Sequence, residues 1–227
     1  MGSLPSDVER PFLRIAHRGF AAIGRDNALD TIAAALSLGA DMIEVDVRLS
    51  SNGRIVLDHD HADAPGAPLL RDALDLIAAA GAGVMLDLKA PGISGALAGL
   101  IARHAPATPV VASGNAREAL QLKRERSSVR AGRTYPQRGS ATGFPIVNAL
   151  VGEWHRFRLA RDAGQVVRGF DVLVAQHRAL SPRAVDRAHA TGAAVFAWTV
   201  DGRDRVERLR DMGVDGVICD DPRSFGL

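Results

Sequence analysis

Residues 42–47 read MIEVDV, an apolar run of strand character that carries two acidic side chains, Glu44 and Asp46. Because side chains two residues apart in a strand point to the same side, both carboxylates are expected on one face of this strand. The aliphatic residues between and beside them are expected to pack under helices on the other face. The acidic face then points into the interior, or toward the mouth, of a closed sheet.

Short strand-like runs alternate with segments of helical period along the chain, which is typical of parallel βα units. Nine candidate ranges are expected to provide about eight strands: residues 12–16, 42–49, 55–58, 83–89, 109–112, 129–134, 172–176, 194–200 and 216–219. Helices are expected at residues 28–38, 69–80, 94–104, 116–126, 153–163, 182–192 and 203–212.

The turn after the first strand, HRG at residues 17–19, lacks the glycine-rich phosphate loop of open doubly wound sheets. The length of 227 residues is also close to the roughly 250 residues typical of a (β/α)8 barrel. We therefore predict a TIM barrel, with residues 1–227 forming a single domain.

Composition argues against several classes of protein. The chain has 28 Lys and Arg against 26 Asp and Glu, a formal charge of +2, so no strongly basic field suggests a nucleic-acid partner. One cysteine excludes an intrachain disulfide, and residues 1–11 show no basic and apolar leader, so a cytoplasmic location is expected. No apolar run approaches the roughly 20 residues that span a bilayer.

Other polar side chains stand where further strands are expected to end. His17 and Arg18 follow the first strand, His59 follows the third, and Asp87 and Lys89 share one face at the end of the next. Catalytic groups of such barrels collect at the C-terminal ends of the strands. These side chains are therefore expected to meet the two acids of MIEVDV at one mouth.

Two carboxylates side by side in a partly dry site repel each other. Either Arg18 or Lys89 pairs with one of them in a structural salt bridge, or a hard divalent cation binds both. The residues themselves leave these alternatives open. With a cation, the two basic side chains would neutralise a phosphate, and His17 and His59 would share general acid and base work. This inventory suits phosphodiester chemistry.

Specific motifs extend this pattern, most of them in the first sixty and the last thirty-five or so residues: AHRG (16–19), DN (26–27), LGADMIEVDV (38–47), NG (52–53) to HD (59–60), DLK (87–89), AWTVD (197–201) and GVDGVICDDP (213–222). In these motifs the chain resembles the glycerophosphodiester phosphodiesterases of the phospholipase C-like barrel superfamily. Residues 91–178 match that family only in the rhythm of strands and helices.

The resemblance implies a site with the following roles: metal ligands Glu44, Asp46 and Asp87, acid–base residues His17 and His59, phosphate-binding Arg18 and Lys89, and a substrate pocket with Asn27 and Trp198. The cation would be one Mg²⁺ or Ca²⁺ ion, with Mn²⁺ as a further option. The implied reaction is that of a hydrolase of lipid and glycerol metabolism. The glycerol 2-hydroxyl attacks phosphorus and expels an alcohol, and the cyclic phosphate is then hydrolysed to sn-glycerol 3-phosphate.

The chain departs from the family pattern in three places. Asp26 and Asp87 stand where the family usually has glutamate, so it is open whether Asp87 reaches a metal directly or through water. Only residues 60–68 remain of a small insertion that the family carries after His59, so a more open mouth is expected. Two alternatives follow: a related sphingomyelinase D-type enzyme with another substrate, or an anion-binding barrel with weak catalysis. The oligomeric state stays open.

Two basic segments lie outside this pattern. For residues 117–138, a solvated helix face is favoured over contact with a membrane or nucleic acid. Residues 154–158, WHRFR, are amphipathic and suggest contact with lipid or a second subunit as an alternative. Core packing with an arginine rim is favoured there.

Overall fold

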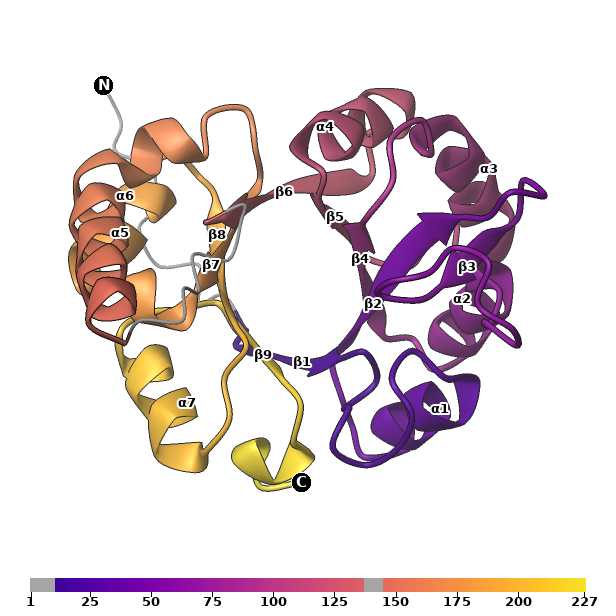
Figure 1. Cartoon of the computed structure of the whole chain (residues 1–227), viewed down its shortest axis with the longest axis horizontal. Helices are drawn as coiled ribbons and strands as arrows, with labels where there is room; N and C mark the ends of the chain where they lie inside the picture. Colours follow the sequence, from indigo (N-terminus) through magenta and orange to yellow (C-terminus); the bar gives the residue numbers. More distant parts are fainter. Residues whose placement is uncertain (1–10, 137–144) are drawn as a thin grey trace.

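The computed structural model describes residues 11–136 and 145–227. Its described strands form a closed barrel of eight parallel strands with helices around the outside (Figure 1). In chain order these are β1 (Leu13–His17), β2 (Met42–Leu49), β4 (Gly83–Leu88), β5 (Val110–Gly114), β6 (Val129–Tyr135), β7 (Val172–Gln176), β8 (Ala194–Trp198) and β9 (Gly216–Cys219). β1 pairs with both β2 and β9, which closes the barrel and confirms the predicted TIM fold.

The helices agree with the sequence prediction to within a few residues, with one exception. They are α1 (Leu29–Ser37), α2 (Leu70–Ala79), α3 (Ser94–His104), α4 (Ala116–Glu125), α5 (Pro145–Val166), α6 (Pro182–His189) and α7 (Arg203–Asp211), with short 3₁₀ turns η1 (His177–Ala179) and η2 (Pro222–Phe225). The exception is α5, which begins eight residues earlier than the predicted start at residue 153. Within the described residues, no helix has the length and apolar character needed to cross a membrane.

The third predicted strand is not a barrel strand. β3 (Ile55–Leu57) pairs antiparallel with the end of β2, opposite Val47 to Leu49. The prediction of a parallel unit was wrong here, because residues 50–54 are too few for a crossover, which takes about a dozen residues or more. β3 instead runs back toward the barrel, and its backbone continues to Asp58, whose N–H donates to the Asp46 carbonyl at 3.2 Å. This hairpin brings the following residue, His59, to the mouth.

The two faces of the strands divide as the spacing of MIEVDV predicts. On β2, Ile43, Val45 and Val47 are fully buried in the layer between barrel and helices. Inside the barrel lies a separate apolar cluster, made of Ile15, Met42, Met85, Val111, Val172, Val174, Ala194, Phe196 and Ile218. Along β2 the interior positions therefore change from a methionine to Glu44 and Asp46 toward the C-terminal end. The charged groups therefore lie next to this apolar interior cluster, at the C-terminal end of the barrel.

Core packing of the aromatic residues in WHRFR was predicted wrongly. Trp154 is 52% exposed and Phe157 is 67% exposed. The face of α5 that packs against the barrel instead carries Leu159 and Ala163, which are fully buried. These residues lie on the side of the helix opposite to Trp154 and Phe157, so the fully buried positions of residues 151–166 follow the WHRFR segment.

Candidate active site

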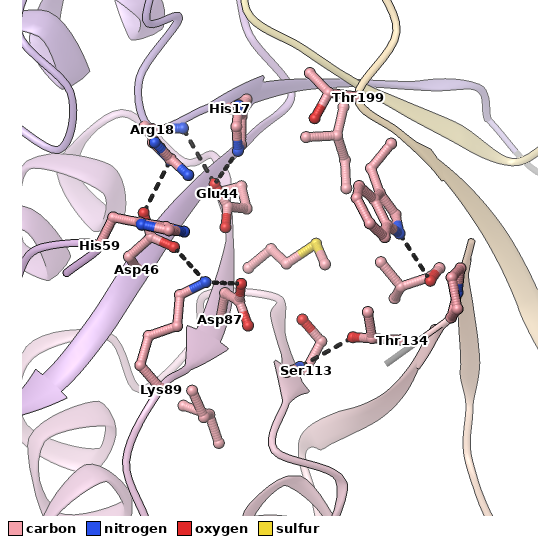
Figure 2. Close-up of a pocket in the computed structure, with 17 residues that line it drawn as sticks. His17, Arg18, Glu44, Asp46, His59, Asp87, Lys89, Ser113, Thr134 and Thr199 are labelled. Carbon is pink, nitrogen blue, oxygen red and sulfur yellow. Dashed lines mark hydrogen bonds and ion pairs between the residues drawn. The ribbon is translucent and has the colours of Figure 1, made fainter. Parts of the chain in front are cut away.

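A pocket of about 520 Å³ lies at the C-terminal ends of the barrel strands. Its lining includes seven of the predicted site residues with charged or titratable side chains: His17, Arg18, Glu44, Asp46, His59, Asp87 and Lys89. Figure 2 shows these side chains gathered on one side of the pocket. Trp198 lines the pocket as well, whereas Asn27 is buried behind it.

The register between strands places three carboxylates together. Glu44 lies beside His17 of β1 in the strand pairing, and Asp46 lies directly beside Asp87 of β4. Each of the three acids offers an oxygen, and these oxygens all lie within 4.8 Å of one another. Glu44 is 4% exposed and Asp46 1% exposed, so most of this negative charge is removed from water.

Asp46 is compensated by basic groups. Arg18 Nε lies 2.9 Å from Asp46 Oδ2, and Lys89 Nζ lies 2.9 Å from Asp46 Oδ1. Asn27 adds two hydrogen bonds, because its Nδ2 donates to Asp46 Oδ2 and its Oδ1 accepts from the Asp46 N–H, both at 3.0 Å. Burial raises the pKa of Asp46, but the charge of Lys89 and these contacts outweigh it and bring the pKa below its ordinary value. The salt-bridge alternative is therefore realised at Asp46.

Glu44 is less well compensated. Burial, which is the largest influence, together with the charges of Asp46 and Asp87 raises the pKa of Glu44 to about 8. Acting in the other direction, His17 Nε2 lies 3.8 Å from Glu44 Oε2, and the Arg18 backbone N–H donates to the same oxygen at 3.1 Å.

The cluster fits a hard divalent cation. Arg18 pairs with Asp46, Lys89 pairs with Asp46 and Asp87, and His17 lies beside Glu44. Part of the Arg18 charge is shared with a fourth acid, because Arg18 Nη1 also donates to Asp26 Oδ2 at 2.8 Å. An excess of carboxylate oxygen thus remains in a buried place, and Mg²⁺ and Ca²⁺ prefer oxygen ligands. Such an ion would stabilise the ionised form of Glu44, which burial disfavours.

Asp220 holds the His17 ring from the side away from Glu44. Its Nδ1 lies 2.5 Å from Asp220 Oδ1, which leaves Nε2 on the side of Glu44 and the pocket. Burial lowers the pKa of His17, but the hydrogen bond to Asp220 and the charge of Glu44 outweigh it, so the pKa is raised. Asp220 was not among the predicted site residues. It follows β9, and only the closure of the barrel brings that strand beside β1.

His59 and Lys89 approach the pocket from neighbouring segments. His59 Nδ1 lies 2.8 Å from Asp60 Oδ1, and its side chain is 44% exposed. Lys89 Nζ lies 2.6 Å from Asp87 Oδ2 as well as beside Asp46, and these two carboxylates raise the pKa of Lys89 against the opposing influence of burial. His59 is thus more exposed to solvent than His17, the other member of the predicted catalytic pair.

The opposite side of the pocket is formed by neutral residues that sequence reasoning did not identify. They are Ser113, Thr134, Pro136, Val174 and Thr199, beside the predicted Trp198. Trp198 Nε1 donates to the Val174 carbonyl at 3.0 Å, which fixes the indole ring against this wall. No special residue type marks such a wall in the sequence, since hydroxyl and aliphatic side chains at strand ends are common.

A model of the glycerophosphoryl diester phosphodiesterase family matches residues 17–71 and 107–224, which is more than half of the chain. The chain belongs to this family. It is 26% identical over 251 residues to the glycerophosphodiester phosphodiesterase of Caldanaerobacter subterraneus subsp. tengcongensis, covering 94% of this chain and 96% of the relative. Family and relatives are phosphodiesterases of glycerophosphodiesters, which agrees with the predicted class of enzyme.

Solved structures show the same fold. A phosphodiesterase of Oleispira antarctica, described in complex with the product sn-glycerol-3-phosphate, superposes with a TM-score of 0.73 at 20% identity, over 94% of this chain and 95% of that chain. The glycerophosphodiester phosphodiesterase of Thermotoga maritima gives a TM-score of 0.69 at 19% identity, over 95% and 97% of the two chains.

If Glu44, Asp46 and Asp87 hold a cation, Gly114→Ala is expected to weaken its binding by roughly tenfold or more, as loss of a group that orients a ligand does. Gly114 ends β5 with a φ of +76°, and a Cβ there would lie 1.9 Å from Asp87 Oδ1 and 2.9 Å from the Leu88 carbonyl oxygen. The Asp87 carboxylate would have to move away from its family-predicted place as a ligand. The measurement is a calorimetric titration of the metal-free protein with Mg²⁺ and Mn²⁺.

Gly81→Ala is a matched control for this substitution. Gly81 has a φ of +69°, but a Cβ there would meet no atom within 4 Å. Both variants therefore carry a similar backbone strain, of about 1–3 kcal/mol, while Gly114→Ala alone disturbs Asp87. Equal metal affinity in the two variants would show that Gly114 does not position a ligand.

Proposed function

We propose that the protein hydrolyses glycerophosphodiesters to sn-glycerol 3-phosphate and an alcohol, and that it depends on a divalent cation. The observation that carries this proposal is the convergence of two histidines, two basic side chains and three carboxylates in one pocket of a family barrel. The product in the Oleispira antarctica phosphodiesterase supports the same substrate class. The chain is proposed to act as a single barrel domain, because both described segments contribute strands to one sheet.

Glu44, Asp46 and Asp87 are the residues that would hold the cation, Mg²⁺ or Ca²⁺ with Mn²⁺ as an alternative. When bound, it would supply positive charge against the phosphate oxygens, where negative charge develops during the reaction. Dependence of the family on divalent metals supports this assignment. Arg18 and Lys89, which line the same pocket, bind the phosphate and orient it.

The acid–base work falls to His17 and His59. One takes the proton of the glycerol 2-hydroxyl as its oxygen bonds to phosphorus, and the other gives a proton to the alcohol oxygen as its bond to phosphorus breaks. The reverse exchange of protons lets water open the cyclic phosphate to the monoester. Asp220 keeps Nδ1 of His17 occupied, so that Nε2 is the atom available to the substrate.

A substrate and metal screen tests the proposal. Protein treated with EDTA is expected to release no glycerol 3-phosphate from glycerophosphocholine, glycerophosphoethanolamine or glycerophosphoglycerol, and to recover turnover with Mg²⁺, Ca²⁺ or Mn²⁺. Turnover that persists at full rate in EDTA would contradict the metal site. If none of the substrates turned over with any of the metals, the proposed activity itself would be wrong.

A second candidate is an enzyme that stops at the cyclic phosphate, as sphingomyelinase D-type barrels are thought to. It is favoured by Asp87, the shorter acid, which is followed two residues later by Lys89 and is in contact with it at 2.6 Å. Phosphorus NMR of the reaction separates the candidates. Transient cyclic phosphate followed by a monoester supports the first, and cyclic phosphate as the end product supports the second.

A further inference from the structure

The outer face of α5 carries two aromatic side chains in solvent. Trp154 and Phe157, three residues apart, lie on the same side of the helix, and they are the most exposed large hydrophobic residues of the described chain. The opposite side of α5 holds Leu159 and Ala163 against the barrel, so the exposure is a consequence of how the helix docks. Neighbouring exposed aromatic residues on one face mark an interaction surface.

Each aromatic ring has a guanidinium group beside it. The Arg158 Cζ atom lies 5.2 Å from the centre of the Trp154 ring, and the Arg161 Cζ atom lies 6.0 Å from the centre of the Phe157 ring. Arg161 also pairs with Asp162 at 2.8 Å, whereas Arg158 forms no ion pair within residues 11–136 and 145–227. These four side chains, Trp154, Phe157, Arg158 and Arg161, are called the aromatic–arginine face below.

The surroundings of this face are basic. On the described part of α5 and on α6, which packs beside it, the arginines are Arg156, Arg158, Arg161, Arg183 and Arg187, and the acids are Glu153, Asp162 and Asp186. Arg187 reaches across to α5, where its Nη1 donates to the Arg161 carbonyl. Arginines therefore outnumber acids by five to three on these two helices, which gives the pair a net positive charge.

We propose that the aromatic–arginine face docks the protein on the surface of an anionic lipid bilayer. Tryptophan and phenylalanine rings enter the headgroup region, and arginines beside them bind lipid phosphate through the planar guanidinium fork. The helix lies along the surface and does not cross it. This docking is separate from the proposed phosphodiesterase activity, because none of the four side chains lines the active-site pocket.

A second copy of the chain fits the face less well. In a two-fold symmetric dimer the same patch meets itself, so a face that carries Arg158 and Arg161 would meet a second face with the same two arginines. Like charges repel each other strongly in an interface that excludes water, whereas an anionic bilayer presents the complementary charge.

The face is held firmly near the active site. His155, between its members, packs edge-on against Tyr135 with ring centres 5.5 Å apart, and Tyr135 OH donates to the His155 carbonyl at 3.3 Å. Tyr135 ends β6, and the next residue, Pro136, lines the pocket. Docking through α5 would thus bring this side of the barrel mouth to the lipid surface.

The test uses tryptophan fluorescence, since the chain has only two tryptophans. In the Trp198→Phe variant, Trp154 is the sole reporter. With vesicles of phosphatidylglycerol at low ionic strength, its emission is expected to shift to the blue and to be quenched by brominated acyl chains, and the protein is expected to sediment with the vesicles. Phosphatidylcholine vesicles are expected to have neither effect. Unchanged emission and no sedimentation with phosphatidylglycerol would overturn the proposal.

Variants of the otherwise unchanged chain locate the contact. Trp154→Ser with Phe157→Ser, and separately Arg158→Glu with Arg161→Glu, are each expected to lower the vesicle-bound fraction about tenfold or more. Leu38→Ser with Leu76→Ser is the matched control, because these side chains are 39% and 37% exposed at the end of α1 and on α2, away from α5. This variant is expected to bind as the parent does.

Sedimentation velocity tests the alternative that the face binds a second copy of the chain. The protein is expected to stay the same size with and without the two serine substitutions, and circular dichroism melting confirms that all variants are folded. A dimer that the Trp154→Ser and Phe157→Ser substitutions dissociate, without binding to phosphatidylglycerol, would overturn docking on lipid in favour of a second copy.

Discussion

Glu44→Gln is expected to lower the rate of glycerol 3-phosphate release by roughly 10³-fold or more, through loss of charge at the proposed cation site. Glutamine keeps the size and one oxygen of the side chain but removes the negative charge that a cation requires. The barrel should stay folded, because Glu44 is replaced by a neutral group of similar shape above the apolar filling. The measurement is turnover at saturating metal, with metal affinity from titration. Full turnover in this variant would refute the assigned site.

The same substitution has a predicted effect on stability in EDTA. An ionised Glu44 is destabilised by burial, and its pKa rises from 4.5 to about 8 in the folded state. Between these values the native state keeps a proton that the unfolded state has lost, so the free energy of unfolding falls as pH rises. Glu44→Gln cannot titrate and should lack this loss, becoming more stable than the parent by a few kcal/mol near pH 8. Parallel stability curves between pH 5 and pH 8 would contradict this.

His17→Ala is the second substitution with a large expected effect. Removing a general acid or base costs roughly 10²–10⁴-fold in kcat. KM should change much less, because Arg18 and Lys89 remain to bind the phosphate. Steady-state kinetics of glycerol 3-phosphate release measure both quantities. A fall in affinity with kcat unchanged would mean that His17 binds substrate and transfers no proton.

Asp220→Asn separates orientation from chemistry at the same ring. The imidazole stays in place but loses the carboxylate at 2.5 Å that holds Nδ1 and raises the His17 pKa. The expected loss in kcat is smaller than for His17→Ala, and the pH dependence attributed to His17 should move toward lower pH. An activity profile identical to that of the parent would remove Asp220 from the site.

Spacing along single strands was enough to predict much of the site. Glu44 and Asp46 share a face because strand side chains repeat every two residues, and the same holds for Asp87 and Lys89. The sequence did not show which charged groups form pairs. Lys89 contacts both Asp46 and Asp87, and it is the register between β2 and β4 that places these two acids side by side. The family resemblance suggested a pocket role for Asn27, but the structure places this side chain behind Asp46, where it holds the carboxylate.

Local sequence patterns gave wrong predictions where the same spacing of apolar residues is compatible with two different arrangements in the fold. The run before His59 looked like another barrel strand, but it returns along β2 as an antiparallel hairpin. The aromatic residues of α5 looked like core, but the docking of the helix turns them outward.

By itself, the sequence of this protein determined the barrel, the interior faces of β2 and β4, and the identity of the acids and histidines expected at strand ends. Periodicity and local residue chemistry are sufficient for that. The tertiary structure decided which groups are in contact. Asp220 contacts His17, and Gly114 lies against Asp87. The side chains of Arg18 and Lys89 pair with Asp46 in preference to Glu44. The physical reason is that electrostatic and steric contacts act over a few ångströms, and only barrel closure and strand register set distances of that size between segments far apart in the chain.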